Sequence, residues 1–281
     1  MGKILLTGAS GFLGSNIVQT LQKSKKVICG YKNFKPPEKN CVKTDLANLS
    51  QLKSTLDAIQ PNIIIHTAAI SRPKQCLQNP ELSKLVNIES TGIIADWCKH
   101  NQARLIFTST DMVYSGENPS YTEKDQTRPV NIYGQQKVQD EQLIAEKCEN
   151  FAILRLALMY GRGFYQRDYA SQWLERDLKI KMQEDDPEPV GLYTDQIRSM
   201  ISVKNVAKII KELAHSNHQG IFNIGGRQPI SRYEFGRELI KVLAISDRLI
   251  KPVKYQNLEP DVQAPLDVSL DIDKALKSFT T

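Results

Sequence analysis

The stretch MGKILLTGASGFLGSNIV, residues 1–18, places Gly8, Gly11 and Gly14 between an apolar run of strand length and a helical pattern. Glycines at this spacing permit a tight turn, a close approach of the backbone to a ligand, and contact between helix and strand. The dipole and the N–H groups at the start of the following helix favour an anion. We therefore interpret residues 7–14 as the dinucleotide-binding turn of a βαβ unit, an interpretation that this context favours over a ligand-free glycine connection.

Beyond this turn, strand-length apolar runs alternate with longer helical patterns, which is typical of a parallel sheet covered by helices on both faces. The expected strands are 3–7, 26–30, 41–44, 62–67, 104–109 and 151–156, and the expected helices are 12–22, 49–59, 81–100 and 131–148. The sequence therefore predicts a doubly wound α/β domain of the Rossmann type over residues 1–158.

After residue 158 the regular alternation gives way to a polar stretch with charges, prolines and aromatics. We expect residues 159–198 and 226–281 to form a smaller, C-terminal substrate-binding lobe. A helical pattern at 202–216 and a strand-like run at 220–226 predict that residues 199–225 return to the sheet. Two further helices are expected, one from 231 to about 243 and a short one near 272–278.

Composition and charge argue against several classes of protein. The 281 residues are 41% hydrophobic and 24% charged, no apolar run approaches the length of a membrane span, and the chain begins in a strand pattern; we expect a cytoplasmic protein without a membrane partner. The 37 basic and 31 acidic residues are distributed without a basic block, which argues against a nucleic-acid partner. Five cysteines without a Cys-x-x-Cys pair predict reduced thiols and no metal site.

In such folds the residues at the tip of the second strand contact the adenosine ribose and discriminate between NAD and NADP. An acidic residue there would accept hydrogen bonds from the NAD 2′-hydroxyl and repel the NADP 2′-phosphate. The sequence CGYKNFK at 29–35 has no acid there but carries Lys32 and Lys35. This favours NADP(H), with NAD(H) as the alternative cofactor and two solvated lysines as the competing interpretation. After the third strand, Asp45 and Leu46 could flank the adenine, and Asp45 could equally cap the next helix.

The segment NIYGQQKVQDE, residues 131–141, spaces Tyr133 and Lys137 four apart, on one face of a predicted helix. The preceding strand ends near Thr110, and the ends of parallel strands are where such sheets hold ligands. A phenol can donate a proton to a carbonyl oxygen on which negative charge develops during reduction. A neighbouring ammonium would lower the pKa of the phenol and so make it easier to form the phenolate. Tyr133 and Lys137 fit these roles. The Thr110 hydroxyl would orient the same oxygen, with Asp111 adjacent; without the tyrosine, both would be read as a polar turn.

Together these residues resemble the extended short-chain dehydrogenase/reductases and, within them, the dTDP-4-dehydrorhamnose reductase branch of sugar-nucleotide reductases. The resemblance runs nearly end to end, through TGASGFLG (7–14), TSTDMVYSG (108–116), PVNIYGQQKVQDE (129–141), YTDQIRSMISVKNVA (193–207) and PLDVSLDIDKA (265–275). It implies a catalytic set of Thr110, Tyr133 and Lys137, with Asp111 close by. The cofactor contacts that it implies are Gly8, Gly11, Phe12, Leu13, Asp45, Leu46, Ala68 and Ala69.

The resemblance also assigns roles to residues that mean little alone. Asn87 matches an asparagine that supports the active-site lysine through backbone and water contacts. Met112 stands where family dehydratases carry a glutamate, which favours simple reduction. Residues 263–264 are Gln-Ala where family reductases usually place an arginine before the proline, so an unusual substrate is expected. We expect Arg162 and Arg198 to contact a diphosphate, because a guanidinium can bind phosphate through two hydrogen bonds. The competing interpretation is that each arginine is a surface or ion-paired residue.

The sequence therefore predicts an NADPH-dependent reductase of a 4-keto sugar nucleotide, with Tyr133 as general acid. The first alternative is an NAD(P)-dependent sugar-nucleotide epimerase that retains its cofactor. The second is a non-catalytic NADP(H)-binding regulatory subunit, a role that some reductase-like proteins have. The expected partner is a nucleotide-sugar substrate, and the sequence allows a homodimer.

Overall fold

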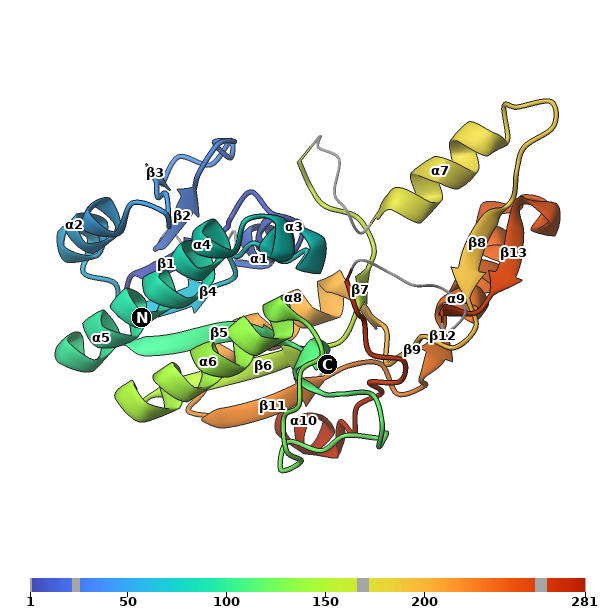
Figure 1. The fold of residues 1–281 in the computed structure, drawn as a ribbon. Coiled ribbons are helices and arrows are strands. Elements are labelled where there is room, and N and C mark those ends of the chain that lie inside the picture. Colours follow the sequence, from blue (N-terminus) through green and yellow to red (C-terminus); the bar gives the residue numbers. More distant parts are fainter. Residues whose placement is uncertain (1, 22–25, 166–171, 256–261, 281) are drawn as a thin grey trace.

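The computed structural model describes residues 2–21, 26–165, 172–255 and 262–280. Figure 1 shows a larger lobe built on a twisted sheet and a smaller lobe at the opposite end of the molecule. The sheet has seven parallel strands in the order β11-β6-β5-β4-β1-β2-β3. These strands are β1 (Ile4–Thr7), β2 (Val27–Tyr31), β3 (Cys41–Lys43), β4 (Ile63–His66), β5 (Arg104–Thr110), β6 (Phe151–Leu156) and β11 (Gly220–Ile224). The predicted doubly wound α/β fold is confirmed.

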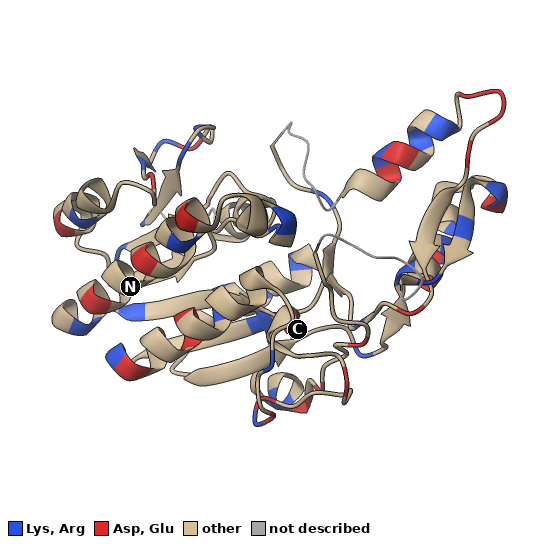
Figure 2. Ribbon diagram, viewed as in Figure 1, with Lys and Arg blue, Asp and Glu red and all other residues tan. Residues whose placement is uncertain are grey.

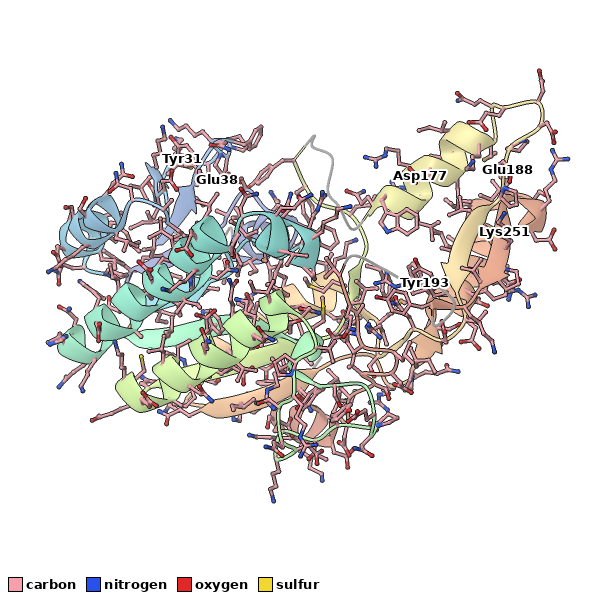
Figure 3. The ribbon with its side chains drawn as sticks, in the orientation of Figure 1. Tyr31, Glu38, Asp177, Glu188, Tyr193 and Lys251 are labelled. Atoms are coloured by element: carbon pink, nitrogen blue, oxygen red, sulfur yellow. The ribbon has the colours of Figure 1, made fainter. Side chains whose placement is uncertain are left out.

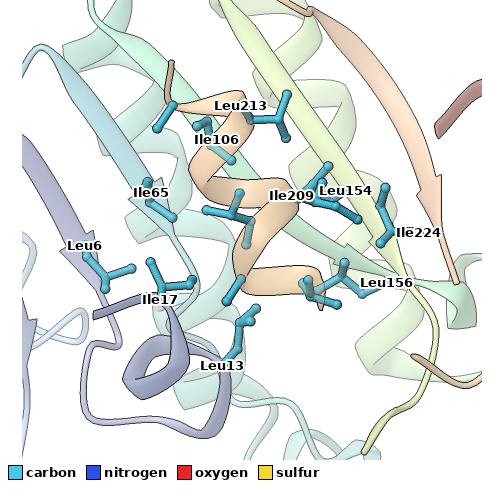
Figure 4. Packing of buried hydrophobic residues seen from close by; sticks show 14 of the residues in the cluster. Leu6, Leu13, Ile17, Ile65, Ile106, Leu154, Leu156, Ile209, Leu213 and Ile224 are labelled. Atoms are coloured by element: carbon cyan, nitrogen blue, oxygen red, sulfur yellow. The ribbon is translucent and has the colours of Figure 1, made fainter. Parts of the chain in front are cut away.

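Helices cover both faces of the sheet because alternate strand residues point to opposite sides. The helices on the face that receives Ile4 and Leu6 are α1 (Phe12–Leu21), α8 (Val203–Leu213) and α10 (Asp273–Ser278). Those on the face that receives Leu5 are α2 (Leu49–Ile59), α5 (Ser90–Asn101) and α6 (Ile132–Lys147). Figure 4 shows Ile209 and Leu213 of α8 packed over the first face. Each such buried side chain contributes about 1.5–3 kcal/mol.

Short elements connect the strands on the side of the larger lobe that holds the site. They are α3 (Pro73–Gln78), α4 (Pro80–Lys84), the π-helical turn η1 (Leu85–Glu89) and the 3₁₀ turn η2 (Asp111–Val113). The single helix expected over 81–100 is therefore divided into α4, η1 and α5. Pro80 occupies the first turn of α4, where its missing N–H leaves no bond unmade.

The smaller lobe is built from short strands paired over long sequence separations. A parallel pair joins β8 (Val190–Tyr193) to β13 (Ile250–Val253), and an antiparallel pair joins β9 (Ile197–Arg198) to β12 (Ile230–Ser231). The parallel pair of β7 (Met159–Tyr160) and β10 (Ile201–Ser202) packs instead on the core of the larger lobe, through Met159 and Ile201. Two helices, α7 (Trp173–Lys181) and α9 (Arg232–Leu243), and the 3₁₀ turn η4 (Asp247–Leu249) complete it. Its core contains Leu174, Leu178, Leu192, Ile240 and Ile250.

Charged residues are interspersed over both lobes, as Figure 2 shows, in line with the 37 basic and 31 acidic residues of the sequence. Within the described ranges, no helix combines the length and the apolar character needed to cross a membrane.

Candidate active site

A cavity of about 730 Å³ lies where the carboxyl ends of β1, β4 and β5 face the smaller lobe. Its size is within the usual range for ligand sites, and it lies where the strand order reverses, the position at which open α/β sheets bind ligands. The residues predicted for the site that line it are Gly8, Gly11, Phe12, Leu13, Lys32, Asp45, Leu46, Ala68, Ala69, Thr110, Asp111, Tyr133, Lys137 and Arg198. The other predicted site residues, Gly14, Asn87 and Arg162, are absent from the lining.

The glycine turn between β1 and α1 forms one wall of the cavity. Gly8 has φ +69°, and a Cβ there would lie 2.9 Å from the backbone nitrogen of Ala68. A Cβ on Gly14 would lie 2.0 Å from the carbonyl oxygen of Gly8, so this glycine allows the helix to pack on the turn. Helix α1 begins at Phe12, so its positive end faces the cavity. A bare backbone cradle at a helix start fits the pyrophosphate of a nicotinamide dinucleotide.

The start of α6 brings Tyr133 to the end of β5. The side chain of Asn131 caps this helix by accepting a hydrogen bond from the Gly134 N–H at 2.9 Å. A Cβ on Gly134 would lie 2.3 Å from the Met112 carbonyl oxygen, so the helix start packs directly on the η2 turn. Tyr133 therefore faces the same cavity as Thr110, the last residue of β5.

The ammonium of Lys137 is buried between two partners. Its Nζ lies 3.7 Å from Asp140 Oδ2 and 4.1 Å from the centre of the Phe107 ring. Burial lowers the pKa of Lys137, and the neighbouring Asp140 opposes this effect. Burial also raises the pKa of the Asp140 carboxyl to about 7. Sequence reasoning missed Asp140, although its position three residues after Lys137 is a signal that could have found it.

Burial raises the pKa of the Tyr133 phenol, and the nearby Cys76, Asp140 and Asp111 raise it further. The sequence-based expectation that Lys137 lowers this pKa is not met in this structure, because the ammonium faces Asp140 and Phe107. At neutral pH Tyr133 is consequently a protonated phenol, the form that can donate a proton.

Lys32 and Asp45 form an ion pair on the cavity wall, with 3.0 Å between Nζ and Oδ1. Burial acts to raise the pKa of Asp45, but hydrogen bonds from the Ala47 N–H and Lys32 hold that pKa below its usual value. The cap of α2 is Asn48, whose side chain accepts from the Gln51 N–H at 3.0 Å, so the alternative that Asp45 caps this helix is wrong.

Arg198 and Asp111, both buried, lie with the partly buried Arg232 on the smaller lobe's side of the cavity. Arg198 Nε lies 3.7 Å from Asp111 Oδ2, and the rest of its guanidinium donates to the carbonyls of Ile197, Pro265 and Leu266. Arg232, which sequence reasoning missed, also lines the cavity; burial and the charge of Arg198 lower its pKa to about 10. Burial raises the pKa of Asp111, although Arg198 opposes this. Two cations facing one carboxyl make this end of the cavity suited to an anion.

Arg162 and Asn87 lie elsewhere. The Arg162 side chain is 71% exposed and donates to Glu175 Oε1 at 2.8 Å, so the expected diphosphate contact has no support from its position. Asn87, in the η1 turn, accepts from the Ile70 N–H at 2.9 Å and donates to Gln136 Oε1 at 2.7 Å. Its side chain thus contacts the residue before Lys137, and it braces helix α6.

The Rossmann sheet, the glycine turn at its first strand and a Tyr-x-x-x-Lys pair on one cavity define an extended short-chain dehydrogenase/reductase, the class of NAD(P)-dependent oxidoreductases that includes the sugar-nucleotide reductases and epimerases. Residues 2–281 match the RmlD substrate binding domain family, and the chain belongs to that family.

Known proteins similar to this chain include both enzymes and a subunit. The probable low-salt glycan biosynthesis reductase Agl14 of Haloferax volcanii is 27% identical over 272 residues, which cover 95% of this chain and 89% of that protein. Methionine adenosyltransferase 2 subunit beta of Rattus norvegicus is 25% identical over 279 residues, covering 97% and 81%. The crystal structure of dTDP-4-dehydrorhamnose reductase from Bacillus anthracis in complex with NADP has a TM-score of 0.85 at 24% identity, covering 100% and 94%.

Proposed function

We propose that this chain reduces the carbonyl group of a 4-keto sugar nucleotide, with NADPH as the preferred cofactor. The observation that carries this proposal is that Thr110, Tyr133 and Lys137 line the same cavity as the glycine turn. The similarity to a glycan biosynthesis reductase over 95% of the chain supports the same reaction class.

The bound cofactor would supply the hydride, and the protein would handle the proton. Tyr133, protonated because it is buried, donates its phenolic proton to the substrate oxygen as negative charge develops there. The Thr110 hydroxyl accepts from the Met112 N–H at 3.3 Å and donates to Asp111 Oδ1 at 3.2 Å. With substrate bound, this hydroxyl would turn from Asp111 and donate to the same oxygen, which orients it. Lys137 lines the same cavity, with its ammonium paired to Asp140.

The positive end of the cavity fits the diphosphate of a nucleotide sugar. The Arg198 Nη atoms are occupied by backbone carbonyls, so this residue acts through its charge and its position. Arg232 donates through Nε to Gln196 Oε1 at 3.0 Å, which aims the rest of its guanidinium. Arg232 is therefore the residue we assign to direct contact with the diphosphate.

The preference for NADPH rests on Lys32. The tip of β2 carries no acid that would repel a 2′-phosphate, and Lys32 lines the cavity beside Asp45. A 2′-phosphate would compete with the Asp45 carboxylate for the Lys32 ammonium. A 2′-hydroxyl could instead donate a hydrogen bond to the Asp45 carboxylate. This arrangement favours NADP(H) without excluding NAD(H).

The direct test measures NADPH and NADH consumption with a panel of 4-keto-6-deoxy sugar nucleotides, in the wild type and in Tyr133→Phe. We expect turnover by the wild type and a loss of about 10²–10⁴-fold in the variant, with cofactor binding retained. Equal rates for the two proteins would refute the assigned role of Tyr133.

A regulatory role is the second candidate, because methionine adenosyltransferase 2 subunit beta matches 97% of the chain. This role predicts cofactor binding without turnover on any panel member, together with co-purification with a methionine adenosyltransferase catalytic subunit. The epimerase alternative predicts cofactor retained through purification and no net NADPH consumption.

A further inference from the structure

Two cysteines and a glutamate meet at the edge of the larger sheet, outside the cavity. Cys29 in β2 and Cys41 in β3 are direct partners in the parallel pairing of these strands, and Glu38 lies in the loop that joins them. The two Sγ atoms and a carboxylate oxygen of Glu38 all lie within 4.8 Å of one another. Among the described residues, no other group of three such donors gathers in this way.

We propose that Cys29, Cys41 and Glu38 form a binding site for a thiophilic divalent cation, Zn²⁺, with water as the fourth ligand. Thiolate and carboxylate donors are suited to zinc, and three protein ligands leave the open position of a non-structural site. Tetrahedral bonds of about 2.3 Å to sulfur and about 2.0–2.2 Å to oxygen place the donors about 3.5–3.8 Å apart. The observed separations are at most 4.8 Å, so side-chain movements of roughly an ångström close this geometry.

Wide spacing along the chain and the lack of a Cys-x-x-Cys pair are what predicted no metal site. Here the ligands are separated along the chain and are brought together by strand register, Cys29 opposite Cys41. Neighbouring strands lie about 4.7–4.9 Å apart, so facing side chains on one side of the sheet can share an ion. The loop between them is long enough to fold Glu38 back over the pair.

Both thiols hold their protons in the metal-free protein. Burial raises the pKa of Cys29 to about 12, and the Cys41 thiol donates to the Glu38 carbonyl oxygen at 3.2 Å. Metal binding therefore breaks two S–H bonds, forms two S–Zn bonds and releases two protons to solvent, with no transfer of electrons. Affinity should consequently rise steeply with pH.

The surroundings of the three donors support a charged site. The Tyr165 hydroxyl donates to Glu38 Oε2 at 3.0 Å, which orients the carboxylate as outer hydrogen bonds do for metal ligands. Burial and the neighbouring Glu38 raise the pKa of the Cys41 thiol, and Lys35 opposes this effect. Figure 3 shows Glu38 on the loop beside the end of β2, where Tyr31 is labelled. An ion there would fix the loop that begins with Lys32, a cavity residue.

The test uses the reduced full-length chain, titrated with Zn²⁺ by calorimetry in buffers of different ionisation enthalpy and with Cd²⁺ by the thiolate-to-metal charge-transfer absorption. We expect one ion per chain, release of about two protons and a band typical of two thiolates. Cys41→Ser should lose the band, and Glu38→Gln should bind at least about tenfold more weakly while keeping it.

The matched control is Cys148→Ser, because Cys148 and Cys98 are also neighbouring buried thiols but do not belong to a group with a carboxylate. This variant should bind like the wild type, and thermal unfolding would verify that each variant is folded. Absence of stoichiometric binding, or an unchanged band in folded Cys41→Ser, would overturn the proposal. So would a Cys29–Cys41 disulfide in the protein as purified whose reduced form binds no ion.

Discussion

At the scale of single residues, the buried pair Lys137–Asp140 controls the charge beside the proton donor. Both side chains are almost completely buried, and neither oxygen of Asp140 accepts a hydrogen bond within 3.5 Å. The Lys137 ammonium at 3.7 Å and the Thr91 side chain are the neighbours that favour its ionised form. Burying two charges is unfavourable unless they compensate each other, so each residue opposes the effect that burial has on the pKa of the other. Asp140 thus acts on the site through Lys137, as a positioning residue.

This dependence predicts a pH effect on stability. The pKa of Asp140 is about 7 in the folded protein, against 3.8 as its ordinary value, so between these values the folded state holds a proton that the unfolded chain releases. The contribution of this group is fully present below about pH 4 and is lost as the pH rises through 7. Asp140→Asn removes the titration. The free energy of unfolding, measured in urea from pH 4 to 7, should therefore fall for the wild type relative to the variant. A difference independent of pH would contradict this assignment.

The role of Lys32 predicts a selective change in cofactor use. Lys32→Ala removes the only cation that lines this part of the cavity wall among the described residues, and should raise the KM for NADPH about tenfold, equivalent to about 1.4 kcal/mol. The KM for NADH should change little, because a ribose hydroxyl carries no charge. Lys35→Ala, outside the cavity lining, is the control and should leave both constants near wild type. Equal effects on both cofactors would exclude contact with the 2′-phosphate.

Sequence spacing anticipated the residues whose positions are set locally. Tyr133 and Lys137 lie on one helix face, and the glycines follow a single strand, so neighbouring residues largely determine where they lie. Arg232 could not be recognised, because tertiary packing brings it to the cavity. Arg162 shows the opposite error: its residue type suits a phosphate, but it pairs with Glu175 on the surface.

At the scale of elements, two helical glycines make opposite predictions. Gly14→Ala would place a Cβ 2.0 Å from the Gly8 carbonyl oxygen, so α1 must move off the turn. We expect loss of NADPH binding and a lower melting temperature. Gly92→Ala, in α5, meets nothing within 4 Å and should instead stabilise the helix by up to about 1 kcal/mol. Thermal unfolding with and without NADPH compares the two. A Gly14→Ala protein that binds NADPH normally would show that this close packing is dispensable.

The elements also show where local patterns stop being informative. Helix α2 has the predicted bounds, 49–59; in the structure the Asn48 side chain caps its start, and Gln60 ends it in the left-handed conformation. Helix α7 was missed, since only Leu174 and Leu178 are buried in a mostly polar segment. The short strands β8 and β13 pair across some sixty residues, as in Val190 with Ile250, so their partners cannot be read from local periodicity.

At the scale of the whole molecule, the cavity lies between two lobes that contribute different groups to it. The larger lobe supplies the glycine turn and the Tyr133–Lys137 pair, and the smaller lobe supplies Arg198 and Arg232. Neither lobe alone encloses the site. The lobes are tied together beside it by the Arg198 guanidinium, whose Nε lies 3.7 Å from Asp111 Oδ2, and by the Asn131 amide, which donates to the Gln263 carbonyl at 3.2 Å.

Because the two lobes contribute different groups, we expect NADPH and a nucleoside diphosphate to protect different regions of the chain from amide hydrogen exchange. NADPH at a hundred times its dissociation constant should stabilise the protein by about 2.7 kcal/mol and slow amide hydrogen exchange in residues 8–13. A nucleoside diphosphate such as dTDP, added to the NADPH-saturated protein, should then slow exchange around β9 and the start of α9, where Arg198 and Arg232 lie. Inorganic phosphate at the same concentration is the control and should add little, because it lacks the second phosphate and the nucleoside. If dTDP protected only the glycine turn, or nothing beyond NADPH, the arginines would not be the diphosphate site, and the smaller lobe would have another ligand.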